Sequence, residues 1–600
     1  GRATNLAAIA NKRTEGDWTV FSVDGLGTPT LIGKTSVDQR VRLVAVPTIK
    51  NGVRAAYETI VLDSSGATPA AYTVFVDAKN GAILMRYNRV DHLEQDSPPP
   101  PAQLAPAAPA FGQFSGSTDQ PNNCGIDHPI DVPAGTWTID VVGSAINPVN
   151  DIVLYLLDSA KNEVTHQDTG TSPEAVHYEF VSPPATPVTY YARVCEFNTG
   201  DDPFTYDGAW ATNDVAGSGS VLAYPPKWRY FRANPSLAND PSGDDPYDHV
   251  NTDTRVLGCW VLVHEGTPIS GCSSAVGKLQ NLASRVPWDH IVQSNTSSFT
   301  TIGNNALSGE PWTTPLTPGP LHQRPVHLDR NYSDAWTNAW NQSRCDTANL
   351  VPGGNDINAS VTNLFVAHNR MHDWSYFLGF TEDTWNLQEN NFGNNPGAGA
   401  EHDPEFGQAQ SGALLPVEAG VSRDNANQIT LNDGVPGITN MYLWQPIAGG
   451  FYARCVDGDY DMSVIGHEYT HAISNRMAGG PDANLTGTQA RAMGESWSDL
   501  AAVEYLNEFG LVPTNSENRF TVGSYVTGNF DRGIRNYNMS TSPLNYSDVG
   551  YDFVCNAPLI HPEIEGTCPD GRTQVHADGE IWSAINYQLR AAFVDRYNGS

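Results

Sequence analysis

Residues 466–481, with the sequence GHEYTHAISNRMAGGP, constrain this chain more than any other stretch, because they hold two histidines four positions apart. Residues four apart on an α-helix share one face, so His467 and His471 can reach the same zinc ion. Glu468 is rotated by about 100° from His467, which brings its carboxylate beside the metal and suits a general base. The pattern predicts a zinc peptidase site, and an ordinary helix with two histidines is the alternative.

A third protein ligand is expected, because a catalytic zinc site usually combines three protein ligands with one open position. The segment GESWSD offers Glu495, at a distance along the chain that fits a helix end, a loop and a returning antiparallel helix. Asp499 lies one turn further on the same face and can accept the outer N–H of a ligand histidine. Both carboxylates could instead be solvated, but WSDLAAVEYL around them is largely apolar, and a buried carboxylate needs a cation or strong hydrogen bonds.

Four helices are predicted from apolar residues at helical spacing. Asp461 or Ser463 could cap the second helix, and Thr488 could cap the third. The alternating carboxylates of DGDYD, residues 457–461, resemble a calcium loop but lack the rest of an EF-hand pattern, and helix capping explains them equally well. The four predicted helices cover residues 358–380, 460–481, 488–510 and 576–597.

The chain divides into four parts, so the predicted fold class is α+β with several domains. Residues 1–95 show strand patterns and an Asn-Gly turn, typical of a small α+β module that ends in a hairpin. Residues 96–110 are a Pro/Ala-rich linker. Residues 111–215 contain short strands with frequent turns, which predicts an all-β sandwich of accessory type. Residues 216–600 carry the predicted helices and both histidines.

The overall charge excludes some classes of partner. The 600 residues carry a net charge of −33, from 66 acidic and 33 basic residues. This balance disfavours nucleic acids and anionic membranes, because both need clustered Lys and Arg. No apolar run is long enough to cross a bilayer.

Eight cysteines at wide spacings, with no Cys-x-x-Cys pair, fit the disulfides of a secreted protein better than a zinc ribbon. Free buried thiols are the alternative. Pairing of neighbours predicts Cys124–Cys195, Cys259–Cys272, Cys345–Cys455 and Cys555–Cys568.

The segment DGDYDMSVIGHEYTHAISNRMAGGP, followed by GESWSD and VHADGEIW, resembles the fungalysin family of secreted zinc metallopeptidases, which are thermolysin relatives among the gluzincins. TIGNNA, VTNLFVAHNRMHDWSYFLGF, NLQENNFG and NMYLW look like fungalysin segments in the same order. The resemblance covers residues 220–600. It implies a thermolysin-like zincin catalytic domain with a mixed-sheet lobe and a mostly helical lobe. It also implies one zinc ion and endopeptidase activity on protein or peptide substrates, through zinc-activated water.

The resemblance assigns a role to each residue of the zinc site. His467, His471 and Glu495 would bind zinc, Glu468 would be the general base, and Asp499 would orient a ligand histidine.

Further roles follow from matching segments outside the zinc helix. His576, in VHADGEIW, would stabilise the oxyanion, although it could be an ordinary helix-start histidine. Arg535 would contact the peptide carbonyl beyond the scissile bond, and an exposed structural arginine is the alternative. NMYLW resembles the edge strand that pairs with substrate backbone, which makes Asn440 and Tyr442 candidate substrate-binding residues.

The N-terminal parts also carry resemblances. Residues 1–93 look like the end of a fungalysin-type propeptide, which in the family acts as an intramolecular chaperone and inhibitor. The predicted sandwich resembles the prepeptidase C-terminal domains of bacterial secreted proteases. Fungalysins continue past the last predicted helix, so we expect that part of the C-terminal lobe is absent from this sequence.

Two rival hypotheses remain from the sequence. In the first, the sandwich binds a polymer or a protein, and the zinc domain is inactive. In the second, which is compatible with peptidase activity, residues 1–95 cover the cleft and the chain is a latent zymogen.

Overall fold

The structure is a computed structural model that describes the chain between Ile9 and Tyr597, apart from several segments. The linker, residues 96–110, and Cys272, Cys555 and Cys568 lie outside the described residues. The longer omitted segments are residues 24–38, 64–69, 93–111, 169–173, 198–202, 214–225, 240–248, 270–276, 313–323, 351–355, 416–421, 447–454, 512–519 and 549–574, and shorter gaps occur elsewhere.

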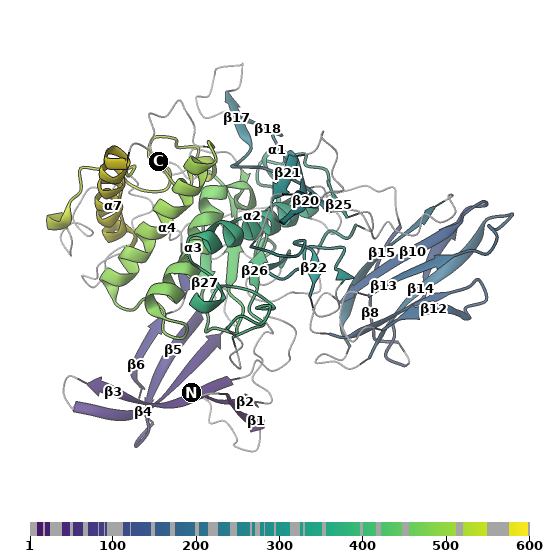
Figure 1. The fold of residues 1–600 in the computed structure, drawn as a ribbon, viewed down its shortest axis with the longest axis horizontal. Helices are drawn as coiled ribbons and strands as arrows, with labels where there is room; N and C mark the ends of the chain where they lie inside the picture. The colour runs from purple at the N-terminus through teal and green to yellow at the C-terminus, as the bar shows by residue number, and fades with distance from the viewer. Residues whose placement is uncertain are drawn as a thin grey trace.

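The N-terminal part is a six-stranded antiparallel sheet whose strands follow sequence order, drawn in purple in Figure 1. Among its described residues there is no helix, so the expected α+β module is all β there. The Asn-Gly turn is confirmed, because Gly81 has φ +72° between the last two strands, a conformation that favours glycine. The strands are β1 (Ile9–Glu15), β2 (Trp18–Val23), β3 (Gln39–Thr48), β4 (Gly52–Asp63), β5 (Ala70–Asp77) and β6 (Ile83–Asn88).

The second part is a sandwich of two four-stranded sheets, with strand orders β13-β10-β15-β8 and β12-β11-β14-β9. Alternate residues such as Ile139 and Val141 point into the core between the sheets. The predicted disulfide between Cys124 and Cys195 is present. The strands are β8 (Gly112–Ser117), β9 (His128–Val132), β10 (Thr138–Ala145), β11 (Ile152–Leu157), β12 (Glu163–Gln167), β13 (Glu174–Glu179), β14 (Val188–Glu196) and β15 (Thr205–Asn213).

The third part begins with a sheet of order β20-β19-β16-β25, in which β21 also pairs with β19. Two short antiparallel pairs, β17-β18 and β22-β23, accompany it. The strands are β16 (Lys227–Tyr230), β17 (Ser236–Asn239), β18 (His249–Thr252), β19 (Val256–His264), β20 (Thr267–Ile269), β21 (Gly277–Gln280), β22 (His290–Ile291), β23 (Thr296–Ser297) and β25 (Asn331–Tyr332).

The sheet next to the candidate site is mixed, with strand order β24-β26-β28-β27-β7. β7 comes from the chain before the linker and pairs antiparallel with β27. A short pair, β29-β30, follows this sheet in sequence. The strands are β7 (Val90–His92), β24 (Ala306–Gly309), β26 (Glu405–Gln408), β27 (Ala426–Ile429), β28 (Ile438–Met441), β29 (Leu443–Trp444) and β30 (Val456–Asp457).

The four predicted helices are all present and lie together, as Figure 1 shows. α3 packs against both α2 and α4, and α4 packs against α7. None of the described helices is long and apolar enough to span a membrane. The long helices are α2 (Ile357–Phe377), α3 (Met462–Gly479), α4 (Thr488–Glu508) and α7 (Val575–Tyr597). The short ones are α1 (Ala339–Gln342), α5 (Ser524–Thr527) and the 3-10 helices η3 (Thr347–Asn349), η4 (Glu382–Thr384), η5 (Gly458–Tyr460) and η6 (Tyr546–Asp548).

The helix caps are only partly as predicted. The Asp461 carboxylate caps α3 by accepting the backbone N–H of Ser463. Thr488 is not a cap, because it is the first residue of α4 and the N-cap is Gly487. An apolar core, which includes Met371, Ile465 and Val503, joins α2, α3 and α4. This core holds α3 between the mixed sheet and the other helices.

Disulfides also tie the third part together. Cys345 is bonded to Cys455, as predicted. Cys259 is disulfide-bonded, and its expected partner Cys272 lies outside the described residues. The free-thiol alternative is therefore wrong for the described cysteines.

Candidate active site

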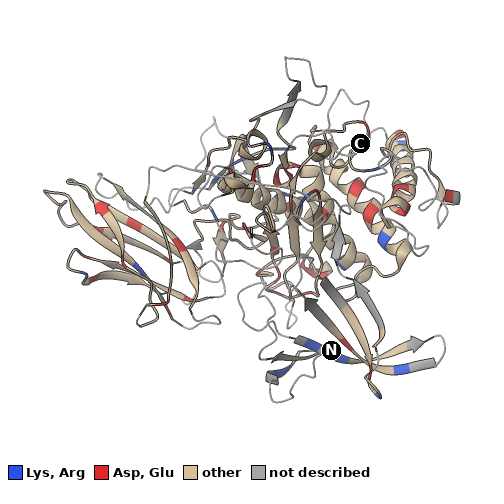
Figure 2. Ribbon diagram, turned by 180° about the vertical axis from the view of Figure 1, so that it is seen from behind, with Lys and Arg blue, Asp and Glu red and all other residues tan. Residues whose placement is uncertain are grey.

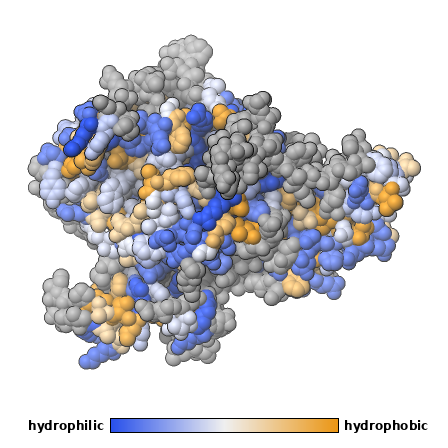
Figure 3. All heavy atoms as spheres, in the orientation of Figure 1, coloured by the Kyte–Doolittle hydropathy of each residue, from blue (hydrophilic) through white to orange (hydrophobic). Residues whose placement is uncertain are grey.

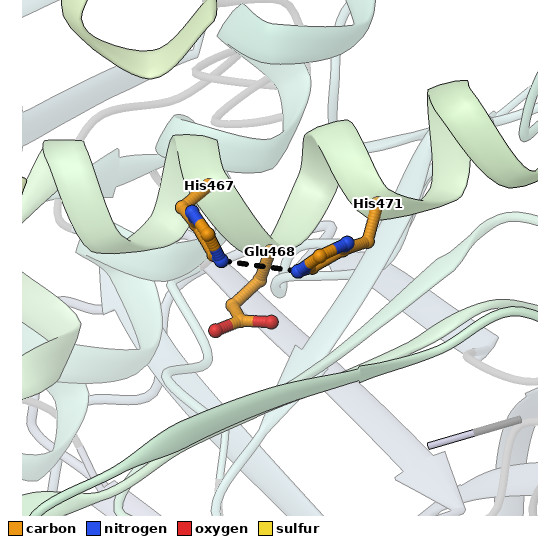
Figure 4. Close-up of side chains that lie close together, drawn as sticks. All are labelled: His467, Glu468 and His471. Atoms are coloured by element: carbon orange, nitrogen blue, oxygen red, sulfur yellow. Dashed lines mark hydrogen bonds between the residues drawn. The ribbon is translucent and has the colours of Figure 1, made fainter. Parts of the chain in front are cut away.

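The two histidines of α3 converge on one point, as Figure 4 shows. The Nε2 atoms of His467 and His471 are 3.0 Å apart, and both side chains are buried. Glu468 projects from the same helix toward the same space and is also buried. Ligand atoms of these three residues lie within 4.8 Å of one another, and the described residues hold no other such trio of His, Cys, Asp or Glu.

The helix α4 returns beside α3 and brings Glu495 to the same point. Its Oε2 lies 3.4 Å from Nε2 of His467, and its Oε1 lies 3.7 Å from Nε2 of His471. The carboxylate therefore straddles the two imidazoles. Glu495 therefore lies beside the two histidines, as predicted from its distance along the chain. The alternative, a solvated carboxylate on the surface, is wrong, because Glu495 is buried.

Asp499, one turn later on α4, contacts the other nitrogen of His467. The distance from its Oδ1 to Nδ1 of His467 is 2.9 Å. This contact fixes the ring orientation and holds a proton on Nδ1, so that Nε2 faces Glu495. The predicted supporting role of Asp499 thus matches the geometry.

Arg535 and His576 complete the group from two further segments. The Arg535 guanidinium donates to both oxygens of Asp499 at 2.9 Å and to Oε2 of Glu495 at 3.3 Å. Arg535 is buried, so the exposed-arginine alternative is wrong. His576, in the first turn of α7, places Nε2 3.5 Å from Oε1 of Glu495. Four predicted site residues, His467, His471, Arg535 and His576, therefore surround the Glu495 carboxylate.

The charges in this site stabilise one another. Burial alone would raise the pKa of Glu495, but the three surrounding histidines hold that pKa well below its usual value. Burial would likewise raise the pKa of Asp499, and Arg535 and His467 lower it. For His467 burial lowers the pKa, but hydrogen bonds to Asp499 and Glu495 outweigh it and raise the pKa to about 9. The site is built to hold positive charge between anionic groups.

Asn440 and Tyr442 do not lie on an edge strand. Asn440 belongs to β28, which has β26 on one side and β27 on the other, and both side chains are fully buried. Their side chains contact Asn427 of β27 from within the sheet: Asn440 Nδ2 donates at 3.0 Å, and Asn427 donates to the Tyr442 hydroxyl at 2.6 Å. The expectation that Asn440 lies on the substrate-binding edge is wrong, because β28 is paired on both sides; Tyr442 comes directly after β28 and is also buried.

β27 lies next to the edge strand β7, a position that was not predicted from the sequence. Without β7, this strand would have one unpaired side. β27 and β7 both lie beside α3. A signal for this strand was available in the sequence, because ANQIT and GITNM flank a turn at Asn432-Asp433-Gly434 and are typical of a hairpin.

The carboxylates of DGDYD have local roles. Asp457 accepts the backbone N–H of Asp459, and Asp461 caps α3. Asp459 accepts the backbone N–H of Gln410 at 2.9 Å. These contacts favour the capping alternative over a calcium loop.

Comparisons with known proteins show the family of the chain. A family model described as fungalysin metallopeptidase (M36) matches residues 264–600. Because this match spans more than half of the chain, the chain belongs to the fungalysin metallopeptidase family.

Two relatives illustrate the similarity. Extracellular metalloproteinase 4 of Trichophyton soudanense is 33% identical over 41% of this chain and 55% of its own length. Extracellular metalloproteinase 5 of Trichophyton rubrum is 30% identical over 52% of this chain and 42% of its own length. The chain therefore spans about half of the curated relatives that it matches.

Among solved structures, the prepeptidase C-terminal domain of a collagenase from Bacillus anthracis is 12% identical and covers 17% of this chain and 89% of its own length. Its TM-score of 0.13 is too low to carry an argument about the sandwich.

Proposed function

We propose that the chain is a zinc-dependent endopeptidase that hydrolyses peptide bonds in proteins. The observation that carries the proposal is the convergence of two imidazoles and one carboxylate from two helices, with Glu468 beside them. Two nitrogens and one carboxylate form a donor set typical of catalytic zinc. When bound, zinc supplies Lewis-acid activation of water and of the substrate carbonyl.

His467, His471 and Glu495 are the residues that would hold the ion. Glu495 is preferred over Glu468 as the third ligand, because its carboxylate straddles both imidazoles from a second helix. Asp499 keeps the Nδ1 proton of His467 in place, which leaves Nε2 as the ligand nitrogen. The contact distances support the roles implied by the family resemblance.

Glu468 is the group that we assign to proton transfer. It accepts a proton from the attacking water and passes that proton to the amine nitrogen as the peptide C–N bond breaks. His576 donates a hydrogen bond to the carbonyl oxygen, on which negative charge develops. A positioned donor of this kind is typically worth about 3 kcal/mol. Arg535, held by Asp499, is our candidate for orienting the substrate carbonyl beyond the scissile bond.

The substrate backbone is assigned to β27. An open sheet edge can pair with an extended peptide, so that main-chain hydrogen bonds hold the peptide beside the catalytic groups. β27 lies beside α3, which carries both histidines and Glu468.

The same strand supports a second proposal, namely that the intact chain is latent. β7 occupies the edge of β27 on which we expect the substrate to lie. Arg42 of the N-terminal sheet also pairs with Asp482, just after α3, at 3.5 Å. Figure 2 shows several basic residues on this sheet, whereas the whole chain carries −33. Residues 1–95 would thus be an intramolecular inhibitor, released by cleavage in the 96–110 linker.

Secretion and an accessory role for the sandwich complete the proposal. The relatives are named extracellular metalloproteinases, and disulfides are typical of oxidising compartments. The retained catalytic set argues against the rival in which only the sandwich is functional. Calcium is not required by the described contacts at DGDYD, so zinc is the one ion that we propose.

The substitution Glu468→Gln tests the mechanism. The variant should bind zinc as the wild type does and should lose casein hydrolysis by at least about a hundredfold, since a general base is worth that much. Glu504→Gln, on α4 away from the histidines, is the matched control and should keep its activity. Unchanged turnover in Glu468→Gln would remove Glu468 from the mechanism.

A further inference from the structure

The beginning of α7 brings three side-chain positions toward the site, and the proposed mechanism uses only the first. These are His576, Gly579 and Glu580, three and four positions apart, so they share one face of the helix. Gly579 and Glu580 contact two different parts of the site. If the chain is the zinc endopeptidase proposed above, on which this inference rests, both contacts affect the substrate side of the site.

Gly579 lets α7 approach the proposed zinc ligand closely. A Cβ atom at this position would lie 2.8 Å from Cβ of Glu495 and 3.1 Å from the carbonyl oxygen of Ala492. Neither atom is at the end of a flexible side chain, so the helices would have to separate. The absence of a side chain at residue 579 therefore sets the distance between α7 and Glu495.

Glu580 holds the segment that carries Arg535. Its side chain is 5% exposed. Its Oε1 accepts the backbone N–H of Asn536 at 2.9 Å and the Asn536 side-chain amide at 3.1 Å, and its Oε2 accepts the backbone N–H of Tyr537 at 3.0 Å. These two backbone groups directly follow Arg535.

The chain of contacts continues from Arg535 to the zinc ligands. The guanidinium contacts Asp499 and Glu495, and Asp499 contacts His467. Asp499, Arg535, Tyr537 and Glu580 also line one small cavity. Glu580 thus fixes the backbone from which Arg535 reaches the site.

We propose that Glu580 is a positioning residue, which aims Arg535 at the substrate carbonyl and at Asp499, with Gly579 fixing the spacing of α7 from Glu495. A merely structural tether between α7 and the 536–537 segment is the competing explanation. The two differ in one respect: a positioning role acts through Arg535 and disappears when Arg535 is replaced.

A double-mutant cycle on the full chain, cleaved in the 96–110 linker, separates these explanations. Glu580→Gln keeps the shape but turns an amide N–H₂ toward one of the backbone N–H groups. We expect kcat/KM for a fluorogenic peptide to fall about tenfold to a hundredfold, mainly through a higher KM, with the zinc content unchanged. In an Arg535→Met background, the same change should have no further effect.

The control is Glu504→Gln, which removes the negative charge from the side chain that accepts a hydrogen bond from Arg590 and also joins α4 to α7. It should leave KM unchanged. If Glu580→Gln does not fold, Glu580→Asp keeps the charge with a shorter reach and takes its place in the cycle.

An equal loss in both backgrounds, or no loss at all, would overturn the positioning role. A wild-type chain without chelator-sensitive hydrolysis would instead count against the proposed function, so the two failures are distinguishable.

Discussion

At the scale of single residues, Asp499 connects the histidines to the substrate side of the site. It contacts Nδ1 of His467 and also accepts two hydrogen bonds from Arg535. Both partners are cations or proton donors, so its carboxylate is needed in the ionised form. The placement of Asp499 beside His467 could be predicted from the sequence, because helical spacing puts Glu495 and Asp499 on one face of α4 and a short connection returns α4 beside α3.

Asp499→Asn should therefore weaken zinc binding about tenfold to a hundredfold, because an amide holds the Nδ1 proton less well than a carboxylate. Competition with a chromogenic chelator measures the zinc dissociation constant directly. Ser498→Ala, at the neighbouring buried position of α4, is the control and should retain wild-type affinity. Wild-type affinity in Asp499→Asn would show that Asp499 does not orient the ligand.

At the scale of elements, the decisive feature is the pairing of β7 with β27. The helices were predictable because each carries its own periodicity and capping signals. Strand order was not, since it depends on which segments meet in space: Asn440 was expected at an edge and lies on an interior strand. β7 precedes its partner by more than three hundred residues, a pairing that no local pattern reveals.

Prolines in β7 should release latency without cleavage. The variant combines Val90→Pro with Asp91→Pro, and proline has no backbone N–H. Because N–H groups point alternately to the two sides of a strand, one of these two residues loses an N–H that faces β27. Hydrolysis of a fluorogenic peptide by the uncleaved variant should approach that of the cleaved wild type. Alanine at both positions keeps the N–H groups and is the control. If the uncleaved proline variant stays inactive, β7 does not block the site.

At the scale of the whole molecule, the N-terminal sheet and the sandwich both contact the catalytic part, as Figure 1 indicates. Val142 and Ala209 of the sandwich pack against Phe299 and Val326, so one outer face of the sandwich is buried. The N-terminal sheet exposes Leu43, Tyr57 and Ile83, and Figure 3 shows hydrophobic atoms on this part. The sequence predicted the separate β-rich parts and led to the hypothesis that residues 1–95 cover the cleft, but it did not predict the contact of the sandwich.

Buried carboxyl groups should make the folded chain less stable as pH rises. Burial raises the pKa of Glu405 to about 7 and that of Asp424 to about 8, against opposing hydrogen bonds. Folding therefore takes up protons between about pH 4 and pH 8, and the free energy of unfolding falls across this window.

Glu405→Gln imitates the protonated form of Glu405. In this variant the free energy of unfolding should therefore fall by about 3 kcal/mol less than in the wild type as the pH rises across this window. Urea unfolding at pH 5 and pH 8 measures the difference. Asp595→Asn, at an exposed position of α7, should leave the pH dependence of the wild type unchanged. The same pH dependence in Glu405→Gln would contradict a protonated Glu405 in the folded chain.

The most direct test of the central claim is the zinc content of the purified wild type and of Glu495→Ala, measured by elemental analysis. Casein hydrolysis is assayed on the same wild-type sample after cleavage of the linker. We expect one zinc ion per wild-type chain, lost or weakened in the variant, and hydrolysis that a chelator abolishes. A wild type that holds no zinc, or a variant that holds it as tightly, would contradict a zinc site built from His467, His471 and Glu495.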